Sequence, residues 1–328
     1  MLFTLVSQLT FSKLRVSPHF TKLSYIFARR YVRKRQNWYE SFDKDEGEKN
    51  KPEEIDLLYG LNVVLPAIEQ SRRTMYALYY KDSTLSRKRD DPATDRIFFL
   101  AEKHSIPTIR KSPYELSKLT EDRPHQGFVL EASRIKPIRI TTLDKLGRTG
   151  YRILSPGNNS IGMRLSTRRF PLWIALDQIV DPQNLGAIMR TAYFMGVDGF
   201  VMCTTESAPL SGFASKASAG VLEVMDIYDT DRMDRFLETS SRNGWKVFGS
   251  VSPENVDATS IVDLSPPVQL QPSILVLGGE GKGLRPFIRN VCQEMVYIPS
   301  LGERGLLHVD SLNVSAAAAV LIYKFLLG

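Results

Sequence analysis

The sequence contains few of the residues from which metal sites and disulfide frameworks are built. Among its 328 residues are two cysteines, Cys203 and Cys292. They are too far apart in sequence to give a metal-ligand spacing or a disulfide framework. The four histidines form no ligand pattern either, and they are His19, His104, His125 and His308. We therefore expect no metal site.

Long hydrophobic runs are also missing. The most apolar stretch, residues 314–327, is interrupted by Lys324, and it is shorter than the roughly 20 apolar residues that a membrane-spanning helix needs. We therefore expect no membrane partner. The apolar content of 43% is ordinary for a globular protein, and the length allows two domains.

Acidic residues are absent before Glu40, although this stretch contains eight lysines and arginines. The net charge of +7 comes from this stretch, because the other 35 basic residues face 36 acidic ones. Any RNA binding must then use local basic patches. An apolar start followed by basic residues is typical of an organellar transit peptide. We predict a mitochondrial transit peptide over residues 1–38, with import into the matrix; the alternative is a basic arm that contacts nucleic acid.

Residues 39–54 form a charged linker without core residues, and a small α/β domain is expected over residues 55–135. Its first helix is indicated by apolar residues at helical spacing, namely Val63, Val64, Ala67 and Ile68. The pattern continues as a strand at 75–80, a helix at 91–103, a strand at 108–110, a helix at 112–119 and a strand at 128–132.

Polar, glycine and proline residues alternate over 136–169, which we interpret as a linker, with or without an insertion. A larger domain then occupies residues 170–328. Apolar strands alternating with helices indicate a parallel sheet covered on both faces. The expected strands are 172–176, 200–202, 224–227, 246–250, 274–277 and 296–298.

Three strand-to-helix junctions in this domain carry small polar or glycine residues: 181–190, 278–283 and 311–315. Ligands of open α/β sheets gather at such junctions. The glycines of 278–283 allow a ligand to approach the backbone closely. Val276 and Gly283 exclude a P-loop, and Leu284 excludes the dinucleotide fingerprint.

Taken singly, the polar residues of these junctions have ordinary explanations. Asn184, Ser311 and Asn313 are suited to cap helices. Arg190 has the usual explanation of a solvated surface charge, although neighbours such as Ile188 and Met189 are apolar enough to argue against it.

Together, the three motifs resemble the SpoU (TrmH-like) family of RNA ribose 2′-O-methyltransferases. They occur in the family's order within residues 176–315. Upstream, residues 59–64 and 125–127 resemble the start and end of the family's small RNA-binding domain, which is similar to ribosomal protein L30e. With the leader, the sequence is most similar to the mitochondrial branch, which modifies a guanosine of large-subunit rRNA.

The resemblance implies an α/β SPOUT domain with a C-terminal trefoil knot and a homodimer whose site is built across two subunits. S-adenosylmethionine is the implied cofactor, and the backbone at Gly278, Ile298 and Leu312 is implied to hold its adenosyl part. Arg190 is implied to be essential, with Asn184, Glu280, Ser311 and Asn313 fixing it and the ribose by hydrogen bonds. Arginine has a pKa above about 12, so whether Arg190 takes the hydroxyl proton or only holds phosphate and oxyanion is left open.

Other interpretations stay open at this point. The substrate is tRNA in one alternative, and in another the chain is a catalytically silent ribosome-assembly factor. A nicotinamide-dependent oxidoreductase is disfavoured by the missing fingerprint. The connection 300–310 is longer than usual for the family, and either adds RNA contacts through Arg304 or His308 or is only a longer loop. The basic cluster 86–89 is a candidate RNA patch.

Overall fold

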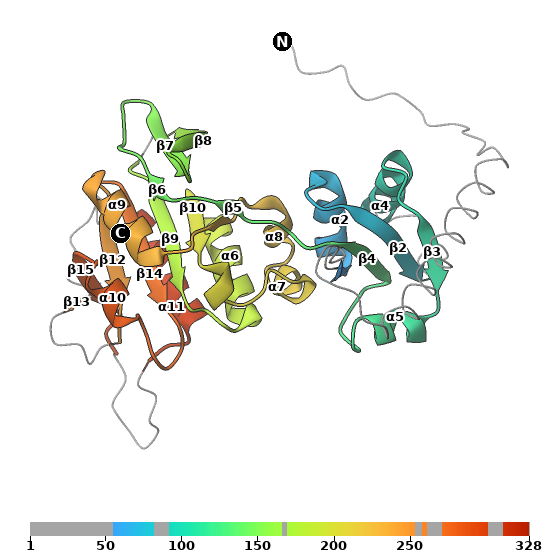
Figure 1. The fold of residues 1–328 in the computed structure, drawn as a ribbon. Helices are drawn as coiled ribbons and strands as arrows, with labels where there is room; N and C mark the ends of the chain where they lie inside the picture. Colours follow the sequence, from blue (N-terminus) through green and yellow to red (C-terminus); the bar gives the residue numbers. More distant parts are fainter. Residues whose placement is uncertain are drawn as a thin grey trace, which may run out of the picture.

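The computed structural model describes residues 55–81, 92–165, 169–252, 258–260, 271–300 and 311–327. These residues form a small and a large α/β part that meet at a narrow waist (Figure 1). The predicted transit peptide, the charged linker 39–54, the cluster 86–89 and the loop residues Arg304 and His308 lie outside the described residues.

The small part is a four-stranded sheet in the order β1-β4-β2-β3 with helices packed on it. Its helices and strands are β1 (Ile55–Tyr59), α2 (Leu61–Gln70), β2 (Met75–Lys81), α4 (Pro92–Lys103), β3 (Thr108–Lys111), α5 (Pro113–Leu119) and β4 (Phe128–Ser133). The helices and strands expected here are confirmed. The four apolar residues that predicted α2 are all buried in its core.

The start of α5 carries a charge-dependent cap. Ser112 and Glu115 form a capping box, in which each side chain accepts a hydrogen bond from the other residue's backbone N–H. The backbone N–H of Ser112 and the side chains of Lys111 and Ser112 donate to Glu115. They lower the pKa of its carboxyl from 4.5 to about 2.

Acid should therefore loosen the first turn of α5. A lowered pKa means that the cap stabilises the helix fully above pH 4.5 and loses this contribution as the pH falls to about 2. Protection factors of the α5 amides, measured by hydrogen exchange in NMR, should fall across this window. In Glu115→Gln the protection should be low throughout and nearly independent of pH. A Glu115 carboxyl that titrates near 4.5 would contradict the prediction.

The large part is an eight-stranded sheet in which every strand pair is parallel, in the order β13-β15-β12-β14-β9-β10-β11-β5. Its strands are β5 (Ile138–Arg139), β9 (Leu172–Asp177), β10 (Gly199–Met202), β11 (Tyr228–Asp229), β12 (Lys246–Ser250), β13 (Thr259–Ser260), β14 (Ser273–Gly278) and β15 (Glu294–Tyr297). The predicted parallel sheet is confirmed.

Helices cover both faces of this sheet. One face packs against α6 (Pro182–Met195), α7 (Gly212–Ala217), α8 (Val221–Val224) and α11 (Val314–Leu327), and the other against α9 (Met233–Arg242) and α10 (Pro286–Arg289). Successive residues of β9 face opposite cores, with Ile174 in the first and Trp173 in the second. Burial on both faces explains why the central strands are continuously apolar.

One expected strand was wrong, and the region predicted as a linker with or without an insertion contains regular structure. In the segment 224–227, expected to be a strand, Val224 is the last residue of the short helix α8, and the strand pairing begins only at Tyr228. A short apolar run does not distinguish the two structures. The supposed linker 136–169 contains β5 and a separate antiparallel sheet of β6 (Thr142–Leu143), β7 (Gly150–Ser155) and β8 (Asn159–Leu165). Buried Tyr151 anchors this sheet, since its hydroxyl accepts a hydrogen bond from the Trp173 indole at 2.7 Å.

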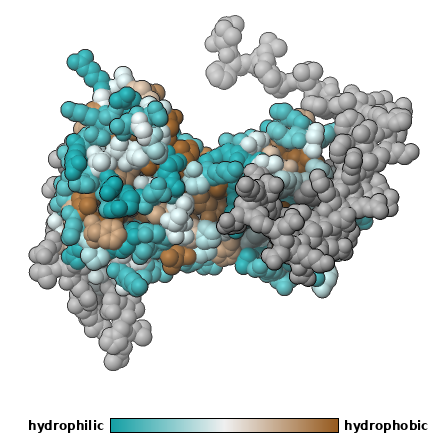
Figure 2. Space-filling view, in the orientation of Figure 1, coloured by the Kyte–Doolittle hydropathy of each residue, from teal (hydrophilic) through white to brown (hydrophobic). Residues whose placement is uncertain are grey.

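The surface is mostly hydrophilic, with apolar patches on the large part and near the waist (Figure 2). Within the described ranges, none of the helices has the length and apolar character needed to cross a bilayer. The same residues contain no group of three or more His, Cys, Asp or Glu that is arranged to hold a metal ion.

Candidate active site

A cavity of about 790 Å³ opens at the carboxyl ends of the central strands. It is formed by segments that are distant in sequence: residues 250–252 from the end of β12, 278–284 from the end of β14, 298–300 after β15, and 311–314 with part of α11. Parallel strands bring their following loops to one edge of the sheet, where open α/β folds bind ligands. The cavity is therefore the candidate site of the large part.

Six of the eight residues singled out from the sequence line this cavity. They are Gly278, Glu280, Ile298, Ser311, Leu312 and Asn313. Glycine at position 278 permits a tight loop, because a Cβ there would lie 2.5 Å from the carbonyl carbon of Gly283 and from the nitrogen of Leu284. The loop folds back on itself and presents backbone groups to the cavity.

The three motifs meet in a hydrogen-bonded cluster of Asn184, Glu280 and Asn313. Glu280 Oε1 accepts from Asn184 Nδ2 and from Asn313 Nδ2, both at 2.7 Å. Asn313 Nδ2 also lies 3.1 Å from Asn184 Oδ1. Asn184 is 7% exposed. Its neighbour Asp181, not Asn184, caps α6 by accepting from the Gln183 N–H, so Asn184 is free to join the cluster.

Asn313 both caps the start of α11 and takes part in the hydrogen-bonded cluster. Its Oδ1 accepts from the backbone N–H of Ser315 at 2.9 Å and from the Ser315 hydroxyl at 2.6 Å. The cap therefore orients the amide group, so that its Nδ2 points at Glu280. Ser311 lines the cavity and is exposed.

Among the residues that the structure describes, no hydrogen bond or ion pair joins Arg190 to this cluster. The side chain of Arg190 is exposed, and it is not among the residues that line the cavity. The argument that apolar neighbours exclude an exposed charge was wrong, because Ile188 and Met189 turn into the core while Arg190 turns outward. Tyr193 and Phe194, 53% and 85% exposed, follow one turn later on the same side of α6.

An ion pair behind the glycine loop was not predicted. Asp177 is fully buried at the end of β9. Its carboxylate accepts from the backbone N–H of Arg285 at 2.9 Å and from Arg285 Nε at 2.6 Å, and Arg285 also pairs with Glu206. These contacts fix the far end of the 278–284 loop. The sequence feature that could have pointed to this ion pair is the aspartate at the end of an otherwise apolar strand.

A parallel sheet with a glycine-lined cavity at its carboxyl edge, preceded by a separate α/β part, is the arrangement expected from the three motifs. The model of the SpoU rRNA Methylase family matches residues 171–323. A second model, RNA 2′-O ribose methyltransferase substrate binding, matches residues 57–137. The chain belongs to the SpoU rRNA methylase family, as its motifs predicted.

Several proteins with related names are similar to the chain. "rRNA methyltransferase 1, mitochondrial" of Homo sapiens is 34% identical over 82% of this chain and 72% of its own length. The protein of that name from Schizosaccharomyces pombe is 34% identical over 83% and 90%. For the one from Dictyostelium discoideum, also 34% identical, the match covers 68% of this chain but spans only 43% of the relative's length.

Solved structures confirm the fold class. The AdoMet-bound rRNA methyltransferase from Sinorhizobium meliloti has a TM-score of 0.61 at 18% identity, over 83% of this chain and 86% of that one. At this identity the likeness shows the fold alone. The trefoil knot stays a prediction.

Proposed function

We propose that this protein transfers a methyl group from S-adenosylmethionine to the 2′-oxygen of a guanosine ribose in mitochondrial large-subunit rRNA. The observation that carries the proposal is the Asn184–Glu280–Asn313 cluster beside a glycine-lined cavity. The names of the mitochondrial relatives support the rRNA substrate and the location. A relative from Pseudomonas aeruginosa, 29% identical, is named "23S rRNA (guanosine-2'-O-)-methyltransferase", which supports guanosine. The basic leader supports the matrix.

The cavity fits the cofactor in size and in chemistry. Its volume of about 790 Å³ lies within the usual range for small-molecule sites. We assign the adenosyl part to the backbone at Gly278, Ile298 and Leu312, and this assignment is supported by the fact that all three residues line the cavity from different segments. When bound, S-adenosylmethionine supplies a methyl group made electrophilic by the positive sulfur.

The cluster of Asn184, Glu280 and Asn313 then orients the ribose. In the transfer, the 2′-oxygen would form a bond to the methyl carbon as the carbon–sulfur bond breaks. S-adenosylhomocysteine would leave, and the hydroxyl proton would pass to water. One carboxylate oxygen of Glu280, Oε1, is held by the two amides, which fixes the direction in which the other oxygen points. That oxygen accepts a hydrogen bond from the ribose or from a guanidinium. Alignment of the reacting atoms supplies much of the rate.

Arg190 reaches such a site from a second subunit. It shares the exposed side of α6 with Tyr193 and Phe194, and α11, packed beside α6, exposes Val320 and Tyr323. Contiguous exposed apolar residues mark protein contacts. In the homodimer proposed here, the α6–α11 surfaces pack against each other. Arg190 of one subunit then holds the target phosphate and developing oxyanion at the cluster of the other.

Phe194→Glu should give a monomer that does not methylate RNA. The substitution places a charge in the apolar centre of the proposed contact, where it would be buried without a partner. Sedimentation velocity measures the oligomeric state, and methyl transfer to rRNA measures the activity. Phe99→Glu, which changes an exposed phenylalanine of the small part, should leave the oligomeric state unchanged. A Phe194→Glu dimer with normal activity would refute this interface.

The substrate is tested by mapping ribose methylation in mitochondrial rRNA and tRNA after deletion of the gene. Loss of one guanosine methylation in large-subunit rRNA, restored by the intact gene, is expected. Loss of a ribose methylation in tRNA instead would show that the protein is a tRNA methyltransferase. If every methylation persists while ribosome assembly fails, the chain is a silent assembly factor.

A further inference from the structure

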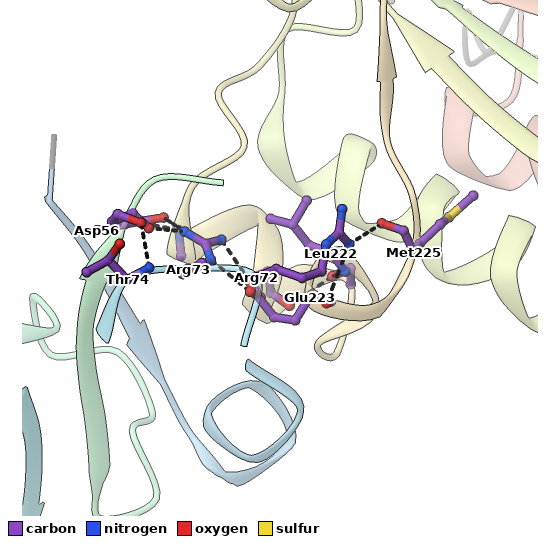
Figure 3. Close-up of polar contacts among 11 residues, drawn as sticks. Asp56, Arg72, Arg73, Thr74, Leu222, Glu223 and Met225 are labelled. Atoms are coloured by element: carbon purple, nitrogen blue, oxygen red, sulfur yellow. Dashed lines mark hydrogen bonds and ion pairs between the residues drawn. The ribbon is translucent and has the colours of Figure 1, made fainter. Parts of the chain in front are cut away.

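A buried arginine joins the small part to the large part. Arg73 is 4% exposed, and its Nε and Nη2 donate to the two carboxylate oxygens of Glu223, each at 2.8 Å (Figure 3). Its Nη1 donates to Asp56 Oδ2 and to the Ser133 carbonyl, both at 3.0 Å. A planar guanidinium bound by two parallel hydrogen bonds fixes an angle as well as a distance.

Further contacts surround this pair. Arg72 Nη1 donates to the Met225 carbonyl at 2.6 Å (Figure 3), and Asp56 Oδ1 accepts from the Gly212 N–H at 2.8 Å. A Cβ at position 212 would lie 2.0 Å from the Leu57 carbonyl oxygen. The two backbones thus meet at a distance that only glycine allows. Several contacts in different directions leave little freedom for a hinge.

The segment 212–224, which contains α7 and α8, also touches the helix of the candidate site. Ser215 of α7 donates to Glu223 Oε1 at 2.8 Å. On its other side α7 packs on α6 at Gly186, where a Cβ would lie 2.5 Å from the Ala217 Cβ. Gly186 is two residues after Asn184. A short, tightly packed path therefore leads from Arg73 to the Asn184–Glu280–Asn313 cluster.

We propose that Arg73 is a positioning residue for methyl transfer, and that its contact with Glu223 sets where RNA held by the small part presents its ribose. The inference rests on the proposed function. The small part extends away from the waist (Figure 1), so a small rotation at the junction becomes a larger displacement of the bound RNA. A reacting group misplaced by about 1 Å can lose about 100-fold in rate.

Gly212→Ala tests the proposal without changing a residue of the site. The new methyl group meets the Leu57 carbonyl across the junction, while position 212 has no positive φ that an alanine would strain. Arg73→Lys is the second variant, because it keeps the charge and loses the two parallel hydrogen bonds. Gly162→Ala is the matched control, since a Cβ there has nothing within 4 Å.

The measurements are kcat on rRNA, the Kd values for rRNA and for S-adenosylmethionine, and the position of the methylated nucleotide. We expect kcat to fall about 10- to 100-fold in Gly212→Ala and Arg73→Lys, or methylation to spread to neighbouring nucleotides. Both Kd values should stay within about twofold of the parent, and Gly162→Ala should match the parent.

Either of two results would overturn the proposal. In one, Gly212→Ala keeps the parent's kcat and target nucleotide. In the other, cofactor binding falls together with kcat, which means that the junction only supports folding. If the unmodified protein methylates no RNA, the proposed function itself is wrong. That result is distinguishable from a failure of the present proposal, in which the unmodified protein is active.

Discussion

Arg190→Lys should abolish methyl transfer to rRNA while S-adenosylmethionine still binds. Lysine keeps the positive charge but cannot hold a phosphate and an oxyanion with one planar group. Loss of such a transition-state contact lowers kcat by about 10²- to 10³-fold. Transfer of a labelled methyl group measures the activity, and calorimetry measures cofactor binding. Arg242→Lys, on an exposed ion pair of α9, is the control, and full activity of Arg190→Lys would contradict the assignment.

Mixed dimers show whether Arg190 acts across subunits. In a dimer of one Arg190→Lys chain and one Glu280→Gln chain, a site shared between subunits receives an intact arginine from one chain and an intact cluster from the other. A statistical mixture should regain about a quarter of the parent activity, because half of the dimers are mixed and each has one complete site. No recovery would place Arg190 in the site of its own chain.

Gly278→Ala should remove cofactor binding. The added methyl group has no room, since the nearest atoms are backbone atoms of Gly283 and Leu284 that a side-chain movement cannot displace. The loop must open, and the backbone groups proposed to hold the adenosyl part move with it. We expect the Kd for S-adenosylmethionine to rise at least about tenfold, which corresponds to about 1.4 kcal/mol.

The same control variant, Gly162→Ala, should bind the cofactor like the parent. Thermal unfolding distinguishes a local change of the loop from a general loss of structure. A Gly278→Ala protein that binds S-adenosylmethionine normally would show that this loop does not hold the adenosyl part.

The sequence predicted those helices and strands whose own pattern of apolar residues shows which faces are buried. Strands such as 246–250 are apolar because both of their faces are covered, and α2 shows its buried face at helical spacing. The sheet of β6 to β8 was missed because its burial depends on contacts with residues distant in sequence, such as Tyr151 with Trp173 and Leu143 with Ser240. The segment 224–227 was misassigned because Arg72 and Arg73, about 150 positions earlier, hold Glu223 and Met225.

The site was predictable to a similar extent. The order of the three motifs indicated one composite site, and the structure joins Asn184, Glu280 and Asn313 by hydrogen bonds. The orientation of Arg190 was not predictable from its apolar neighbours, because a helix of this composition has both a core face and an apolar exposed face. Asp177 and Arg285 are 108 positions apart, and no local pattern links them.

The order of the cavity segments along the chain has a consequence for how the protein matures. All of them lie after residue 249, whereas the RNA-binding part is complete by residue 137. A chain that leaves the ribosome, or enters an organelle, with its N-terminus first has the whole sequence of its RNA-binding part before it has any place for the methyl donor. In a newly made molecule, the residues that bind RNA are therefore available earlier than those that bind the methyl donor.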